Sequence, residues 1–175
     1  MDKPANDNVT ITDVPEHTVE IITNSGEGAQ KCAQFFGQTC AKMGNGVWTV
    51  EIIPAEIEPP HHTVTSTSGN IVRFGTNKIT NWGDQSKLAI AFNDQVCLSR
   101  HRLNSFDDDC IILQESSWEN HEDPDIRKMY ADAMEEMSSK NYRFIGVPIE
   151  EETLKVVDNP SHGKNMFALG LLCEI

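Results

Sequence analysis

The sequence predicts an α/β protein, a single domain with three α/β/α layers around a mixed, mostly parallel sheet. Three observations support this fold class. Short apolar or β-branched runs alternate with amphipathic helical segments along the 175 residues. Two of the runs are wholly apolar, as in strands that are buried on both faces of a parallel sheet. Residues 47–80 hold adjacent strands with little room for a helix, which predicts one antiparallel strand.

The first elements follow a polar segment. Residues 1–15 are expected to form a flexible N-terminal arm, ahead of a domain that covers residues 16–175. Residues 17–23 alternate and then fill with β-branched side chains, which predicts a buried strand. A helix is expected over residues 27–43, because its apolar residues recur on one face: Ala29, Cys32, Ala33, Phe36 and Cys40.

Strand signals dominate the next part of the chain. Residues 47–53 are expected to form a strand that ends before Pro54, followed by an extended loop over 55–62. Residues 63–74 are rich in β-branched side chains. Their Ser68-Gly69-Asn70 break predicts a strand, a turn or bulge, and a second strand.

Two short apolar strands are expected at residues 88–92 and 110–113. Asn93 and Asp94 follow the first of them and can cap a helix over residues 95–101, because their side-chain oxygens accept hydrogen bonds from the first helical N–H groups.

The remaining elements end the domain. Asp123-Pro124 predicts a helix that runs to about Lys140. Its expected inner face is Ile126, Met129, Tyr130, Ala133 and Met137. A strand over 142–147 and a short acidic helix over 150–156 follow. Residues 164–175 form an apolar helix pattern with no stop signal, so we expect the domain to be truncated at its C-terminal end.

Composition excludes several classes of partner. The net charge is −13, which disfavours binding to nucleic acid, and no apolar run is long enough to span a membrane. The five cysteines include no Cys-x-x-Cys, which predicts reduced thiols in a cytoplasmic protein and no iron–sulfur cluster of standard spacing. The adjacent His61 and His62 point to opposite faces of an extended chain, so no metal site is expected there.

The candidate cofactor-binding loop is a Gly-x-Gly turn between the first strand and the first helix. It comprises Asn24, Ser25, Gly26, Glu27, Gly28, Ala29 and Gln30. Such a turn leaves N–H groups unpaired at a helix start, where the dipole favours anions. Lys31 replaces the third glycine of the dinucleotide-binding fingerprint, and no Gly-Lys-Ser/Thr follows. A tight connecting turn that binds nothing therefore remains the alternative.

Three segments are expected to meet at the carboxyl ends of the strands: 24–30, 92–94 and 114–118. Asn93 therefore joins the candidate cofactor-binding residues. The polar candidates for anion or subunit contacts are Arg73, Asn93, Arg100, His101 and Lys164. No catalytic residue is assigned, since no serine lies in a Gly-x-Ser-x-Gly elbow.

An ordered set of motifs carries a family resemblance over about residues 17–175. The motifs are Asn-Ser-Gly-Glu-Gly-Ala-Gln at 24–30, Phe-Gly-Gln at 36–38, residues 46–57, Ala-Phe-Asn-Asp-Gln at 91–95, and Gly-Lys-Asn-Met-Phe at 163–167. The chain resembles the gamma subunit or domain of 2-oxoacid:ferredoxin oxidoreductases, especially the 2-oxoglutarate type.

The resemblance implies a role in oxidative decarboxylation of a 2-oxoacid to acyl-coenzyme A. In that family thiamine diphosphate, iron–sulfur clusters and coenzyme A serve the assembled enzyme, and ferredoxin accepts electrons. The partners implied are the alpha and beta parts, with ferredoxin an indirect one. The chain has no thiamine-type Gly-Asp-Gly motif, so it is expected to bind none of these cofactors firmly and to be inactive alone.

One residue departs from the family pattern. Many separate gamma subunits carry a loop closer to Gly-x-Gly-Gly-Gln-Gly, whereas Glu27 places a negative charge in this loop. That charge favours a subunit contact over phosphate binding. A free-standing nucleotide- or flavin-binding α/β module that shares only the fold stays open as the alternative function.

Overall fold

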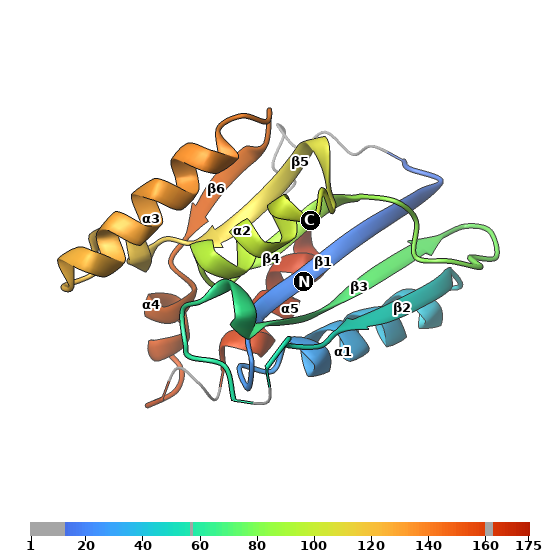
Figure 1. Cartoon of the computed structure of the whole chain (residues 1–175). Helices are drawn as coiled ribbons and strands as arrows, with labels where there is room; N and C mark the ends of the chain where they lie inside the picture. Colours follow the sequence, from blue (N-terminus) through green and yellow to red (C-terminus); the bar gives the residue numbers. More distant parts are fainter. Residues whose placement is uncertain (1–12, 57, 160–162) are drawn as a thin grey trace, which may run out of the picture.

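A six-stranded sheet in the order β2-β3-β1-β4-β5-β6 forms the centre of the molecule (Figure 1). The computed structural model describes residues 13–56, 58–159 and 163–175; residues 1–12 of the expected arm lie outside this range. The strands are β1 (Glu16–Asn24), β2 (Gly46–Ile52), β3 (Thr67–Gly75), β4 (Ser86–Ala91), β5 (Phe106–Glu115) and β6 (Arg143–Val147). The helices are α1 (Ala29–Lys42), α2 (Asp94–Arg102), α3 (Pro124–Met137), α4 (Ile149–Leu154) and α5 (Lys164–Glu174), with short 3-10 turns η1 (Val64–Ser66) and η2 (Ser117–Asn120).

The pairing of the strands confirms the predicted mixed sheet. β1, β4, β5 and β6 pair in parallel. β3 is antiparallel to both of its neighbours, β1 and β2. The antiparallel strand therefore falls within residues 47–80, where the sequence left no room for a crossover helix.

Helices cover both faces of the sheet, which confirms the three layers (Figure 1). One buried cluster joins α1, α4 and α5 to one face, through residues such as Phe36, Ile149 and Leu172. The other joins α2 and α3 to the opposite face, through Val96, Phe106 and Met137. The helix face predicted for α1 is buried as expected, with Ala29, Cys32, Ala33, Phe36 and Cys40 all in the first cluster.

The expected break at Ser68-Gly69-Asn70 is wrong, because β3 runs through it without interruption. Gly69 pairs with Ile22 on one side and Ile52 on the other. A Cβ at Gly69 would lie 2.2 Å from the carbonyl oxygen of Ile21, so glycine here permits a close backbone approach within the sheet. The 3-10 turn η1 precedes the strand instead, and β3 starts at Thr67.

The helix expected over 123–140 is shorter than predicted and presents less of its apolar face to the core. α3 ends at Met137, and Asp123 caps it by accepting a hydrogen bond from the N–H of Asp125. Ala133 and Met137 are buried, whereas Met129 is exposed, because only the C-terminal half of α3 packs on the core.

Candidate functional site at the carboxyl edge of the sheet

The predicted Gly-x-Gly loop connects β1 directly to α1. Gly26 and Gly28 both have positive φ, 90° and 85°, a region that residues with a side chain rarely adopt. Gly28 is the N-cap of α1, and no side chain caps the helix there. No acidic residue lies in the first turn of α1. The first N–H groups of a helix have no intrahelical acceptor, so this end of α1 can accept an anion.

Glu27 is held inside the loop by other residues. Its Oε2 accepts a 2.8 Å hydrogen bond from the backbone N–H of Asn24, and its other oxygen lies 3.9 Å from Nζ of Lys164. Burial raises the pKa of this carboxyl, and Lys164 partly opposes that shift. The negative charge of Glu27, beside the expected anion site, is therefore partly compensated by Lys164 and by the backbone N–H group of Asn24.

The start of α5 lies against the start of α1. A Cβ at Gly28 would lie 2.8 Å from Nδ2 of Asn165. Lys164 forms an ion pair with Glu150 at 2.6 Å in addition to its longer contact with Glu27. Of the polar candidates, Lys164 is thus the one with an ion-pair contact to the loop.

The three predicted segments meet at the carboxyl edge. The backbone N–H of Phe92 donates to the carbonyl of Ile22 at 3.0 Å, and Nε1 of Trp118 donates to the carbonyl of Phe92 at 2.8 Å. Asn24, at the end of β1, accepts hydrogen bonds through Oδ1 from the N–H of His62 and from Oγ of Ser66. Because the ends of β1, β4 and β5 pair side by side, the expected convergence of the three segments is confirmed.

His62 completes this edge, and the sequence analysis did not identify it. Its Nε2 lies 2.7 Å from Oδ1 of Asp94, and its ring stacks on Trp118 with centroids 4.3 Å apart. Gln95 donates to the other oxygen of Asp94 at 2.7 Å. The backbone of His62 has a φ of 54°, which is unusual for a residue with a side chain. The histidine sits in a loop without periodicity, so no signal in the sequence connected it to Asp94.

Asn93 is the predicted cap of α2. Its Oδ1 accepts a hydrogen bond from the N–H of Val96 at 3.0 Å, and the residue is fully buried. Its Nδ2 has no hydrogen-bond partner among the residues that the structure describes. Burial and capping place Asn93 in the framework beneath the edge, without a contact to the Gly-x-Gly loop among the hydrogen bonds seen.

The other polar candidates do not join this site. Arg100 forms a two-pronged ion pair with the buried Glu20, at 2.8 and 3.2 Å. His101 shares a hydrogen bond of 3.1 Å with the hydroxyl of Tyr142. Both contacts lie within the fold, so neither side chain is offered to a ligand in this arrangement.

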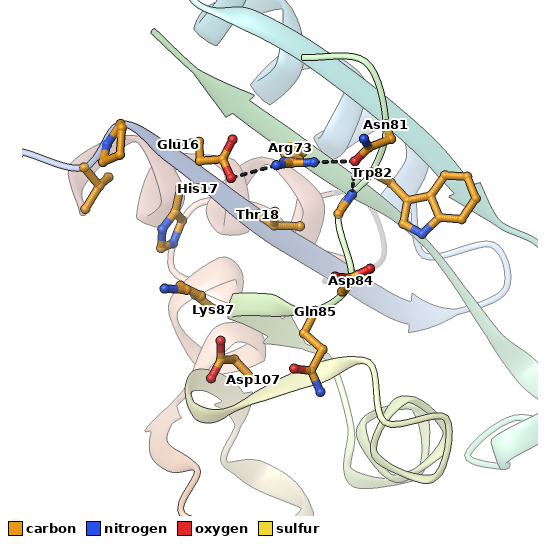
Figure 2. A pocket seen from close by; sticks show the side chains of 13 residues that line it. Glu16, His17, Thr18, Arg73, Asn81, Trp82, Asp84, Gln85, Lys87 and Asp107 are labelled. Atoms are coloured by element: carbon orange, nitrogen blue, oxygen red, sulfur yellow. Dashed lines mark hydrogen bonds and ion pairs between the residues drawn. The ribbon is translucent and has the colours of Figure 1, made fainter. Parts of the chain in front are cut away.

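Arg73 lies in a separate cavity of about 990 Å³ at the amino ends of β1 and β4. Figure 2 shows its guanidinium between Glu16 and Asn81, and the Glu16 contact is 2.7 Å long. His17 lines the same cavity, and burial, assisted by Lys87, lowers the pKa of its imidazole.

Comparison with known proteins decides the family. The family described as pyruvate ferredoxin/flavodoxin oxidoreductase matches residues 19–175, nearly the whole domain. The chain belongs to this family. The resemblance drawn from the sequence motifs is confirmed, and no curated protein matches the chain.

Solved structures of oxidoreductase subunits share the fold. A 2-oxoglutarate:ferredoxin oxidoreductase from Magnetococcus marinus, solved with 2-oxoglutarate, coenzyme A and succinyl-CoA bound, has a TM-score of 0.64 and 20% identity over 90% of this chain. A keto/oxoacid ferredoxin oxidoreductase gamma subunit from Geobacter sulfurreducens has a TM-score of 0.60 and 14% identity over 91% of this chain. Pyruvate oxidoreductase subunit PORC from Thermotoga maritima has a TM-score of 0.55 and 14% identity over 87%.

The extent of each match differs. This chain spans 24% of the Magnetococcus chain, 75% of the Geobacter subunit and 74% of the Thermotoga subunit. Among the described residues of this oxidoreductase-family domain, no helix has the length and apolar content needed to cross a bilayer.

The carboxyl edge of this oxidoreductase-family domain therefore has a buried, hydrogen-bonded part and a solvent-exposed part. Asn24, His62, Asp94 and Asn93 are buried and bonded to one another or to the framework. Gly26 is exposed, and a Cβ there would meet nothing within 4 Å. A ligand can approach the Gly-x-Gly turn and the start of α1, while the histidine and carboxylate behind them support the loop.

Proposed function

We propose that this chain is the gamma component of a 2-oxoacid:ferredoxin oxidoreductase, active only when assembled with alpha and beta parts. The family match over residues 19–175 is the observation that carries the proposal. It favours this function over a free-standing nucleotide- or flavin-binding module. The proposed localisation is cytoplasmic, since the five cysteines are free thiols in the structure.

The proposed 2-oxoacid is 2-oxoglutarate, with succinyl-coenzyme A as the product. The support is the Magnetococcus enzyme, which is similar in fold and was solved with both compounds bound. Oxidative decarboxylation of a 2-oxoacid requires a carbanion-stabilising cofactor and an electron carrier.

The described cysteines of this chain do not fit an iron–sulfur cluster, and its sequence carries no thiamine-type Gly-Asp-Gly motif. Cys32 and Cys40 lie in one core and Cys97 and Cys110 in the other, on opposite faces of the sheet. No group of three or more His, Cys, Asp or Glu among the described residues can hold a metal ion. We assign both cofactors to the alpha and beta parts, with ferredoxin an indirect partner.

The residues at the start of α1 do fit a phosphate group of coenzyme A. The helix end has no side-chain cap, Gly26 leaves space above the turn, and Lys164 lies on its border. We assign this role to residues 24–30, with Asn93 in the framework behind them. Contact with a neighbouring subunit is the alternative role for the same loop.

A calorimetric titration of coenzyme A tests this site. Binding to the isolated chain is expected to be weak, with Kd no tighter than about 0.1 mM, because Glu27 remains partly uncompensated. Glu27→Gln is expected to tighten binding, because it removes a negative charge beside the start of α1. Glu135→Gln, on exposed α3, is the matched control for a change in net charge. If neither Glu27 form binds at millimolar coenzyme A, the loop is a subunit contact; micromolar binding by the unmodified chain contradicts the electrostatic argument.

Co-purification tests the assembly. Mass spectrometry of proteins retained by the tagged chain in its own host should identify alpha and beta parts of an oxidoreductase. The chain alone, supplied with thiamine diphosphate and coenzyme A, should not reduce a viologen dye with 2-oxoglutarate. Turnover by the chain alone would contradict the proposal that it is active only with alpha and beta parts. If the chain retains a flavin or nucleotide and no partner proteins, the binding-module alternative is favoured.

A further inference from the structure

The outer edge of β2 lacks most of the features that usually protect an edge strand, and Glu51 is the one charged residue in it. β2 is the last strand of the sheet on its side, and it pairs only with β3 among the described residues. Its seven residues include no lysine and no proline, and its register with β3 is continuous, without a bulge. An edge of this kind offers a row of N–H and C=O groups to an added strand.

A groove of about 540 Å³ runs beside this edge, between α1 and β2. Its helix wall carries three glutamines one turn apart, Gln30, Gln34 and Gln38, and its strand wall carries Thr49 and Glu51. Side chains of neighbouring strands share the same face of a sheet at alternate positions. Every second side chain of an added strand would therefore enter this groove.

An acceptor oxygen without a partner among the described residues lies on the strand side of the groove. Glu51 is exposed and forms no ion pair with any residue that the structure describes. Asn70, directly opposite Glu51 in the β2–β3 register, also lines the groove. Its Oδ1 is buried and accepts no hydrogen bond from the described part of the chain. Lys31 lines the helix wall and supplies the only positive charge there.

We propose that the edge of β2 and this groove bind an extended segment of a partner protein, added as a further strand, with an arginine directed toward Glu51 and Asn70. A guanidinium presents five N–H donors in a planar fork, so one side chain can serve both oxygens. The net charge of −13 favours a cationic partner. This inference does not depend on the oxidoreductase assignment.

A second copy of this chain fits the edge less well. Antiparallel pairing of two β2 strands about Thr49 would place Val47 of one copy opposite Glu51 of the other. Glu51 and Asn70 would then gain no donor, and two chains of charge −13 would be brought together. Self-association is thus the competing outcome that the experiment must separate.

The probe is a nine-residue peptide, acetyl-Thr-Val-Thr-Val-Arg-Val-Thr-Val-Thr-amide, with its threonines and arginine on one face. The control peptide carries glutamate in place of arginine. Titration into the isotope-labelled chain, followed by NMR, is expected to shift and protect the amides of residues 46–52, with Kd between about 0.1 and 1 mM. The glutamate peptide is expected to bind at least about tenfold more weakly.

Variants of the protein test whether the arginine of the peptide contacts Glu51. Glu51→Gln is expected to weaken binding of the arginine peptide about five- to tenfold, and Glu135→Gln on α3 should leave it unchanged. Absence of binding at about 5 mM peptide, or equal affinity for the two peptides, would overturn the proposal. So would a concentration-dependent dimer in sedimentation velocity whose β2 amides are already protected before peptide is added.

Discussion

Nε2 of His62 lies 2.7 Å from Oδ1 of Asp94, a contact between two buried side chains that are 32 residues apart in the sequence. His62 ends the long connection that follows β2, and Asp94 begins α2. The stack of His62 on Trp118 adds the segment that follows β5. One imidazole therefore joins three connections at the carboxyl edge, next to the loop for which we propose a role in binding coenzyme A.

His62→Ala is expected to lower the free energy of unfolding by about 2–4 kcal/mol, because it removes the stack and leaves the buried Asp94 carboxylate with Gln95 alone. Urea denaturation measures the change. His61→Ala, at the exposed neighbouring position, should change stability by less than about 0.5 kcal/mol. An equal loss of unfolding free energy in the two variants would show that the His62–Asp94 contact does not stabilise the carboxyl edge of the sheet.

Gly28→Val is expected to cost about 1–3 kcal/mol, from the positive φ and from the contact that its Cβ would make with Asn165. Gly26→Val is the matched control, since Gly26 has a similar φ but open space around it. Thermal unfolding should show a lower Tm for Gly28→Val than for Gly26→Val. An equal loss in both would assign the whole effect to backbone strain.

Removing one partner of the Glu20–Arg100 ion pair should lower the free energy of unfolding more than replacing both partners with apolar residues. Glu20 is 1% exposed and also accepts a hydrogen bond of 3.0 Å from Ser86. Arg100→Met leaves a buried carboxylate without its cation and is expected to cost about 3–5 kcal/mol. The double variant Glu20→Leu/Arg100→Met should recover most of that loss in urea denaturation. If it is as unstable as the single variant, the charge pair itself supplies the stability.

Stability should fall as the pH falls below the ordinary histidine value of 6.5. Burial lowers the pKa of both His17 and His101, with Lys87 adding to the effect at His17. The unfolded chain then binds protons more readily than the folded one, so acid favours unfolding. His17→Gln should make the loss of stability between about pH 7.5 and pH 5.5 smaller, measured by denaturation at several pH values. An unchanged pH dependence in His17→Gln would contradict the assignment of this effect to His17.

Local signals were sufficient for most of the fold. The caps Asn93 and Asp123 and the apolar face of α1 lie where the sequence predicted them, since each depends on residues within one or two turns. The convergence of three segments followed from the general rule that parallel strands end at one edge. The expectation that the domain is truncated after Ile175 stays a prediction.

Contacts between distant segments could not be predicted in the same way. Gly69 resembles a turn residue until its two neighbouring strands are placed, and only then does its small size explain an unbroken β3. His62 has no periodicity to connect it with Asp94. Glu27 was placed beside the anion site from its position alone, whereas its hydrogen bond to Asn24 depends on the three-dimensional course of the turn.

The central place of β1 has a consequence for synthesis on the ribosome. β1 is made before both of its neighbours, since β3 covers residues 67–75 and β4 covers residues 86–91. At about 5–20 residues per second, several seconds pass before both edges of β1 can be paired. Val19, Ile21 and Ile22, which are almost fully enclosed in the finished protein, meet water or a chaperone during that interval. The nascent chain therefore carries at β1 unpaired strand edges and apolar side chains that the finished protein buries almost completely.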